Sequence, residues 1–306
     1  MRIYIKHIVL LVAFVTTFNS KAQQLPQFSQ YMYNTLAINP AYAGSNHVLN
    51  LTGLYRNQWV GINGAPVSQT FMIHSPIKNE NMGLGLSMIN DKIGPSNYTS
   101  INTDFSYSIK INEKSKLAFG LKGGINMFQA DLLSETAIDQ NDIAISENIH
   151  NAISPNIGFG MYYHSESFYT GISVPQLLNS TFQTSSSKIY KAEKHAYFIG
   201  GLMLPLSNNV KLKPSTMIQL VNGSRPTLNL TTELLIKNTF WAGLGYRNRD
   251  AVNFLLGYQI TPQIRIGYSY DYTVSKLTTY SKGSHELMLS YDFRFKKNNF
   301  KSPRYF

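Results

Sequence analysis

Residues 263–274 read QIRIGYSYDYTV, and this stretch decides the fold class. Its even-numbered positions are all apolar or aromatic: Ile264, Ile266, Tyr268, Tyr270, Tyr272 and Val274. Its odd-numbered positions are small, polar or charged: Gln263, Arg265, Gly267, Ser269, Asp271 and Thr273. Because successive side chains of a strand point to opposite faces, the stretch predicts an amphipathic strand. Its length fits the roughly 9–11 residues that a tilted transmembrane strand requires.

The same alternation recurs along the chain. It marks candidate strands near 46–59, 67–75, 82–90, 97–111, 115–128, 152–164, 166–174, 195–206, 209–221, 226–237, 239–248, 251–261, 263–274 and 284–296. About fourteen strands is an even number, as single-chain bacterial barrels have when both termini lie on one side. The pattern therefore predicts an all-β fold, a transmembrane antiparallel β-barrel spanning residues 46–306. A soluble β-sandwich also alternates, but here the apolar parity is dense in Tyr and Phe, as lipid-facing girdles are.

The lengths of the connections agree with a barrel. Outer-membrane barrels have short periplasmic turns and longer outer loops. With a periplasmic N-terminus, the two longest connections, Gln129–Asn151 and Pro175–Lys194, both fall on the outer side. The predicted periplasmic connections are short, as at Ile111–Lys114, His164–Glu166 and Thr261–Pro262. The sequence thus predicts an orientation as well as a fold.

The N-terminus is typical of a secretory signal peptide. Two early basic residues precede the apolar run IVLLVAF at 8–14, and Ser20-Lys21-Ala22 places small residues where a signal peptidase reads them. The run is too short for a helical membrane anchor, which needs roughly 20 apolar residues. We expect residues 1–22 to be removed before Gln23, and the mature chain to reach the outer membrane.

Composition excludes several classes of function. The 306 residues include no cysteine, which rules out disulfides, thiol catalysis and cysteine–metal sites. The net charge is +11, and removing the three basic residues of the predicted signal peptide leaves about +8. These charges are scattered among strand-like segments rather than gathered on a helix, so we expect no nucleic-acid partner. Anionic sugars, lipid headgroups or an acidic partner fit this charge better.

Residues 23–45 do not alternate, and they form the predicted non-barrel segment at the periplasmic end. The segment contains PQFSQY at 26–31 and NPAYAG at 39–44, where proline and glycine interrupt regular structure. One interpretation, which we favour, is a plug-like segment that braces the barrel. The other is a docking element for a periplasmic partner. Its candidate docking residues are Phe28, Tyr31, Asn39, Pro40 and Tyr42.

This segment resembles the start of the PorP/SprF family of type IX secretion system membrane proteins from gliding and pathogenic Bacteroidetes. The resemblance continues through RNQW at 56–59, GAP at 64–66, GLG at 83–85, NDKIGP at 90–95 and SPRYF at 302–306. Thr35 stands where the family has proline. The resemblance implies a non-enzymatic outer-membrane component of the type IX secretion and gliding apparatus. The partners it implies are other type IX components, secreted adhesin cargo and a periplasmic peptidoglycan-binding lipoprotein.

No catalytic, cofactor-binding or metal-binding residue is predicted. The histidines lack partners at metal-ligand spacing, no Gly-x-Ser-x-Gly elbow occurs, and GLG at 83–85 lacks the third glycine of a dinucleotide loop. Charged residues on the polar parity predict either a paired network in the lumen or a selective pore: Arg56, Asp104, Lys122, Glu233, Arg265, Asp271, Asp292 and Arg294. Trp59, at the outer end of the first strand, is predicted to join the interfacial aromatic girdle. A general solute porin and, less favoured, an outer-membrane enzyme stay open as alternatives.

Overall fold

A closed antiparallel β-barrel forms the body of the protein in the computed structural model, which describes residues 25–77, 81–134, 148–183 and 188–293. The wall consists of 14 strands in sequence order. The first strand, β1, pairs with the last, β17, and β10 pairs with β12, so the ring of strands is closed. The short strand β11 follows β10 and also pairs with β12. The predicted signal peptide and Arg294 lie outside the described residues.

The strand bounds follow the predicted segments closely. They are β1 Leu49–Asn57, β2 Val67–Pro76, β3 Met82–Ile93, β4 Ser96–Asn112, β5 Ser115–Ala130, β6 Ile149–Ser165, β7 Phe168–Val174, β10 His195–Leu202, β11 Leu204–Pro205, β12 Val210–Val221, β13 Thr227–Ile236, β14 Phe240–Arg247, β15 Ala251–Gln259, β16 Ile264–Thr273 and β17 Ser284–Phe293. The all-β barrel of about fourteen strands is confirmed.

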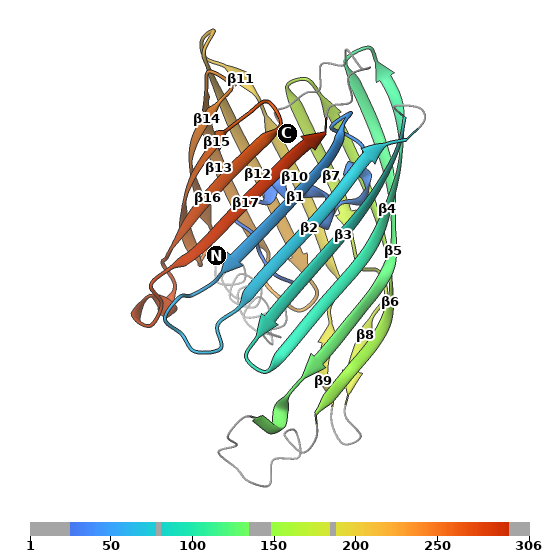
Figure 1. Ribbon diagram of the computed structural model, residues 1–306, viewed down its shortest axis with the longest axis vertical. Helices are drawn as coiled ribbons and strands as arrows, with labels where there is room; N and C mark the ends of the chain where they lie inside the picture. The colour runs from blue at the N-terminus through green and yellow to red at the C-terminus, as the bar shows by residue number, and fades with distance from the viewer. Residues whose placement is uncertain (1–24, 78–80, 135–147, 184–187, 294–306) are drawn as a thin grey trace, which may run out of the picture.

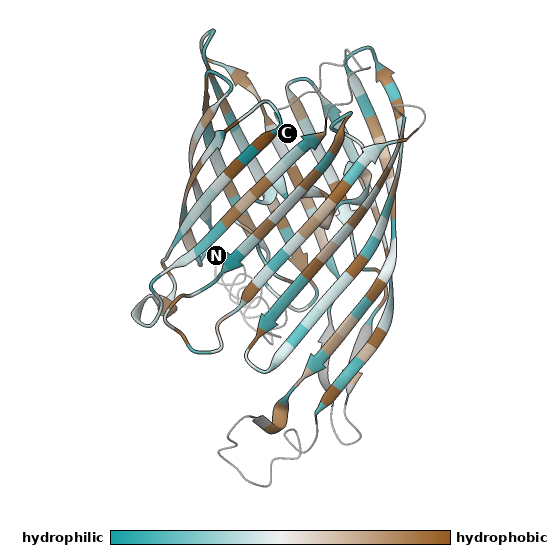
Figure 2. Ribbon diagram, in the orientation of Figure 1, coloured by the Kyte–Doolittle hydropathy of each residue, from teal (hydrophilic) through white to brown (hydrophobic). Residues whose placement is uncertain are grey.

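Alternation of side chains sets the two faces of the wall. In β16, Ile266, Tyr268 and Tyr272 are exposed on the outside, while Ser269 and Asp271 are buried on the inside. Figure 2 shows the same alternation as bands of hydrophilic and hydrophobic colour along the strands. An apolar outer face and a polar inner face are what a barrel wall in lipid requires. No helix in the described part of the chain is long and apolar enough to cross a membrane.

The barrel has a long-loop end and a short-turn end. The strands β1, β3, β5 and β7 finish at the long-loop end, which carries the connections 131–148 and 175–194. The second of these connections contains a small hairpin of β8 (Ser180–Gln183) and β9 (Lys188–Ala192), seen at the bottom of Figure 1. The opposite, short-turn end has connections such as 113–114 and 166–167.

Residues 25–48 lie inside the lumen and form a plug. The plug contains three short helical turns, η1 (Tyr31–Tyr33), α2 (Thr35–Ile38) and η2 (Pro40–Tyr42), visible inside the ring of strands in Figure 1. Its first residues meet Arg56, near the long-loop end of β1, and its later residue Gly44 donates to His74, near the short-turn end of β2. The plug therefore runs the length of the lumen before the chain enters β1.

Glycine residues on the inner face of the wall lie where the plug backbone comes closest to the strands. A Cβ at Gly120 of β5 would overlap the backbone of Ala41, and one at Gly83 of β3 would overlap the carbonyl of Ala43. Glycine is the residue that permits such close approach of two backbones. These inward glycines explain how a barrel of this size accommodates a folded segment along its axis.

Candidate functional site

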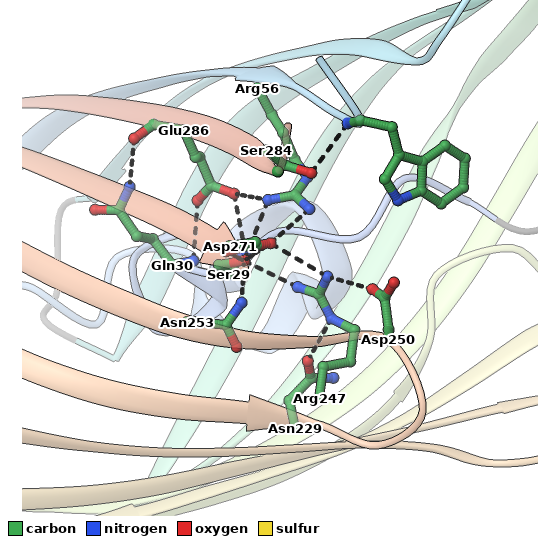
Figure 3. A network of polar contacts seen from close by, with 12 residues as sticks. Ser29, Gln30, Arg56, Asn229, Arg247, Asp250, Asn253, Asp271, Ser284 and Glu286 are labelled. Carbon is green, nitrogen blue, oxygen red and sulfur yellow. Dashed lines mark hydrogen bonds and ion pairs between the residues drawn. The ribbon is translucent and has the colours of Figure 1, made fainter. Parts of the chain in front are cut away.

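A buried polar network near the long-loop end holds the start of the plug. The backbone amides of Ser29 and Gln30 donate to the two carboxylate oxygens of Glu286, at 2.8 and 2.9 Å. The Ser29 hydroxyl donates to Asp271 at 2.7 Å and accepts from Arg56 at 3.1 Å. Figure 3 shows these side chains converging on Ser29 from several strands.

Two arginines neutralise the carboxylates of this network. Arg56 of β1 pairs with Asp271 of β16 at 2.7 Å and with Glu286 of β17 at 3.1 Å. Arg247 of β14 donates to Ser29 at 3.0 Å and pairs with Asp250 at 2.9 Å. Because Arg56, Asp271 and Glu286 are buried, loss of one partner leaves an uncompensated charge, which costs far more than loss of a surface ion pair does. The network also ties the plug across the β1–β17 seam, where the first and last strands meet.

Further contacts hold the middle of the plug. Lys122 pairs with Asp104 at 2.8 Å and points its ammonium toward the carbonyl of Leu36 at 3.4 Å. The Tyr33 hydroxyl donates to Glu233 at 3.2 Å. Burial raises the pKa of the Tyr31 phenol to about 12, so this group stays protonated and donates to Ser215 at 3.1 Å. The plug thus has polar anchors along much of its length.

All five candidate docking residues are buried in the lumen: Phe28, Tyr31, Asn39, Pro40 and Tyr42. Asn39 donates to the carbonyl of Met161 at 3.0 Å and caps η2 by accepting from Ala41. The ring of Tyr42 packs edge-on against Tyr162 at 5.4 Å. These side chains pack the plug against the wall, and a partner could reach them only after the plug had moved. Partner binding by them stays a prediction.

The predicted lumen charges other than Arg294, which lies outside the described residues, face inward and are paired. Lys122 pairs with Asp104, Glu233 with Lys213 at 3.4 Å, and Arg265 with Asp292 at 3.6 Å. Sequence reasoning did not single out Arg247, although it lies on the same parity as Trp241, Gly243 and Gly245 in β14. Arg247 lies at the end of β14, and its contact with Ser29 of the plug could not be read from the strand pattern. Among the described residues, no group of His, Asp and Glu side chains is arranged to hold a metal ion.

The plug leaves little space in the middle of the lumen. Three cavities beside it have volumes of about 10, 20 and 30 Å³, so each is comparable with the space of about one water molecule. A much larger cavity of about 560 Å³ lies at the long-loop end, and we call it the vestibule. Its lining consists of Leu25, Pro26, Gln27, Gln58, Trp59, Pro66, Ser68, Asp91, Ile93, Ser96, Tyr98, Phe128, Thr227, Arg247, Asn248 and Asp250. Trp59 thus lines the vestibule, in contrast to the girdle position that its sequence context predicts.

Solved structures resemble this barrel in fold. The TodX deltaS2S3 mutant monoaromatic hydrocarbon channel matches with a TM-score of 0.50 and 9% identity, covering 85% of this chain and 94% of that chain. The CymD monoaromatic hydrocarbon channel matches with a TM-score of 0.49 and 14% identity, covering 86% of this chain and 93% of that chain. A Pseudomonas aeruginosa FadL homologue matches with a TM-score of 0.49 and 12% identity, covering 89% and 96%. At such identities, the likeness concerns the fold alone.

Sequence comparison is more specific. No curated protein matches the chain. The profile of the family described as "Type IX secretion system membrane protein PorP/SprF" matches residues 20–291, which is nearly the whole chain. That match includes the plug as well as the barrel, and it confirms the resemblance that the N-terminal motifs carry. The chain belongs to the PorP/SprF family of type IX secretion system membrane proteins.

Proposed function

We propose that the protein is a non-enzymatic outer-membrane component of the type IX secretion and gliding apparatus. In this role it assists export or surface anchoring of large adhesins, and it links them to periplasmic components such as a peptidoglycan-binding lipoprotein. Family membership over residues 20–291 supports the secretion role. The proposal includes removal of residues 1–22 as a signal peptide and an orientation with the short-turn end in the periplasm.

The observation that carries this proposal is the filled lumen. A solute porin needs a continuous aqueous path, whereas here the plug is held by hydrogen bonds to buried, ion-paired side chains of the wall. Beyond the vestibule, three cavities along the plug have volumes of only about 10, 20 and 30 Å³. Such a barrel is suited to act as a rigid anchor for other proteins. The solute-porin alternative is therefore disfavoured, although the fold is shared with channels.

The two ends of the plug lie at opposite ends of the lumen. Its first part, around Phe28, lies near the long-loop end, and the part around Gly44 lies near the short-turn end. A periplasmic partner would therefore meet the later part of the plug first. Docking through Phe28 and Tyr31 requires withdrawal of the plug from the lumen. We propose this withdrawn form as the state in which those two aromatic side chains bind a partner, since aromatic residues dominate interface energetics when they enter pockets.

The test is affinity purification from detergent-solubilised outer membrane, with wild-type protein and a variant lacking residues 26–30. We expect wild type to recover type IX components together with a large adhesin or a peptidoglycan-binding lipoprotein. The deletion should leave an assembled barrel, judged by heat-modifiable gel migration, that recovers less of the periplasmic partner. Loss of assembled barrel in proportion to loss of partner would refute docking and leave only bracing. Recovery of no secretion component, together with steady conductance in planar bilayers, would favour the porin.

A further inference from the structure

The vestibule combines an aromatic wall with two carboxylates, Asp91 and Asp250, of which Asp250 pairs with Arg247 at 2.9 Å. Trp59, Tyr98 and Phe128 line it, Leu25 and Pro26 of the plug contribute apolar surface, and Asp91 of β3 is directed into it from the inner face of the wall. Its volume of about 560 Å³ is within the roughly 300–1,000 Å³ range of sites that bind small molecules. The cavity is thus large enough for a ligand, unlike the three small cavities farther along the plug.

Asp91 differs from the other buried carboxylates of the lumen. Its side chain is 7% exposed and accepts a hydrogen bond from the Ser68 hydroxyl at 2.5 Å. No cation of the described residues pairs with it, whereas Asp104, Glu233 and Asp271 each pair with a lysine or an arginine. Buried charges in proteins are normally paired, because an isolated ion in low dielectric is costly. Asp91 therefore has unused capacity to accept a cation.

Trp59 is held at the cavity in an unfavourable backbone conformation. Its φ is 49°, in the left-handed region that a bulky residue rarely adopts. The Trp59 amide donates to the Ser284 hydroxyl at 3.1 Å, and the next amide, of Val60, donates to the carbonyl of Gly283 at 2.8 Å. Strained residues of this kind persist where the surrounding structure fixes them, and they gather at ligand sites. Here the strain places an indole beside the vestibule.

The charge of the vestibule selects against anions. Its one lining cation, Arg247, is already engaged by Asp250 at 2.9 Å and by the Ser29 hydroxyl at 3.0 Å. An anionic ligand would find no unengaged cation in the lining. A neutral sugar would stack on the aromatic rings but would leave the charge of Asp91 uncompensated. A cationic side chain can interact with both the carboxylate of Asp91 and the aromatic rings. Carboxylates pair with ammonium or guanidinium groups, and aromatic faces attract such cations.

We propose that the vestibule is a binding site for a lysine or arginine side chain of an extended peptide segment that enters from the long-loop end. The carboxylate of Asp91 receives the cation, Trp59 covers its charged group, and Leu25 and Pro26 contact its aliphatic stem. Long basic side chains bury such stems against apolar surface readily. The site requires only the folded barrel and its plug, so it is independent of the secretion role proposed above.

The test uses purified full-length Trp241→Phe protein in detergent micelles, in which Trp59 is the remaining tryptophan of the chain's two. The probes are acetyl-Gly-Lys-Gly-Gly-amide, the same peptide with norleucine in place of lysine, and maltotriose. We expect saturable change of Trp59 fluorescence with the lysine peptide and at least about tenfold weaker binding of the norleucine peptide, as for loss of a charge-assisted contact. The Asp91→Asn variant should lose a similar factor. The matched control is Asp131→Asn, an exposed acid outside the vestibule lining, and it should bind as the parent does.

Each other outcome overturns the proposal. Equal binding of the lysine and norleucine peptides would show that the cavity binds only through apolar contacts. Binding of maltotriose alone would show that it is a sugar site. Absence of binding by any probe would also refute it. If Asp91→Asn fails to give a heat-modifiable folded barrel, the lysine and norleucine comparison on the parent protein still decides. A failure here leaves the affinity purification unaffected, so the two proposals are tested separately.

Discussion

The side chains that hold the plug and those that line the vestibule use charge in opposite ways. Among the groups that hold the plug, Asp104 and Asp271 are each paired with a cation at 2.7–2.8 Å. In the vestibule, Asp91 has a serine as its partner, beside a cavity of about 560 Å³. Buried ion pairs with both partners present hold a segment in place, whereas a carboxylate without a cation is free to meet a ligand. The difference separates a structural region from a candidate binding region within one barrel.

The largest effect is expected from removing a cation of the network that holds the start of the plug. Arg56→Ala leaves Glu286 without its ion-pair partner and Asp271 with only the more distant Arg247 at 3.5 Å. Breaking one partner of a buried pair costs about 3–5 kcal/mol, which should appear as a lower midpoint of urea unfolding in lipid vesicles. The control is Arg225→Ala in the exposed 222–226 loop, expected to change stability by less than about 0.5 kcal/mol. Equal midpoints for the two variants would show that the network does not hold the barrel.

A second comparison sets the lipid face against the plugged lumen. Ile266→Arg puts a charge on the exposed face of β16, at a cost of roughly 2–4 kcal/mol near the bilayer midplane. An open, wet lumen predicts a milder effect for Ser269→Arg. Ser269 is, however, 0% exposed, and an arginine there has no space, so we expect both variants to show less heat-modifiable folded barrel. Wild-type migration of Ser269→Arg would mean that the lumen is not filled.

The smallest effect concerns the fit of the plug against the wall. Gly120→Ala places a methyl group against the backbone of Ala41, and overpacking of this kind costs about 1–3 kcal/mol. Gly123→Ala, on the same strand but with no atom within 4 Å of the added carbon, is the matched control. The Gly120 variant should unfold at a lower urea concentration and expose the plug to added protease. Indistinguishable curves would indicate that the plug contacts β5 too weakly to matter.

Much of the barrel could be predicted because lipid imposes a strong constraint on sequence. Alternation in β16 and β17 reports directly which side chains face lipid, and each strand can be identified without knowing its neighbours. The inward charges Arg56, Glu233 and Asp271 were predicted on the same grounds. Their pairings were not, since Arg56 and Asp271 are 215 residues apart and meet only when the barrel closes.

For the plug, the sequence predicted a separate segment but not its position in the lumen. Its lack of alternation identified residues 23–45 as separate from the wall, and its aromatic residues indicated a need for burial. Nothing local specified that Ser29 would lie near the long-loop end, or that Trp59 would line a cavity rather than face lipid. Both facts depend on which end of the lumen the segment occupies, and that is settled by contacts with several strands at once.

The sequence by itself thus determined the membrane barrel, its strand positions and the family to which the chain belongs. Period-two alternation and family motifs are local features, and lipid acts on each strand separately. The tertiary structure alone decided that the lumen is filled, that the plug runs along its axis, and that no cation among the described residues pairs with Asp91. Those properties arise from the three-dimensional meeting of residues distant in the chain, where the space and charge left by one segment are defined by all the others.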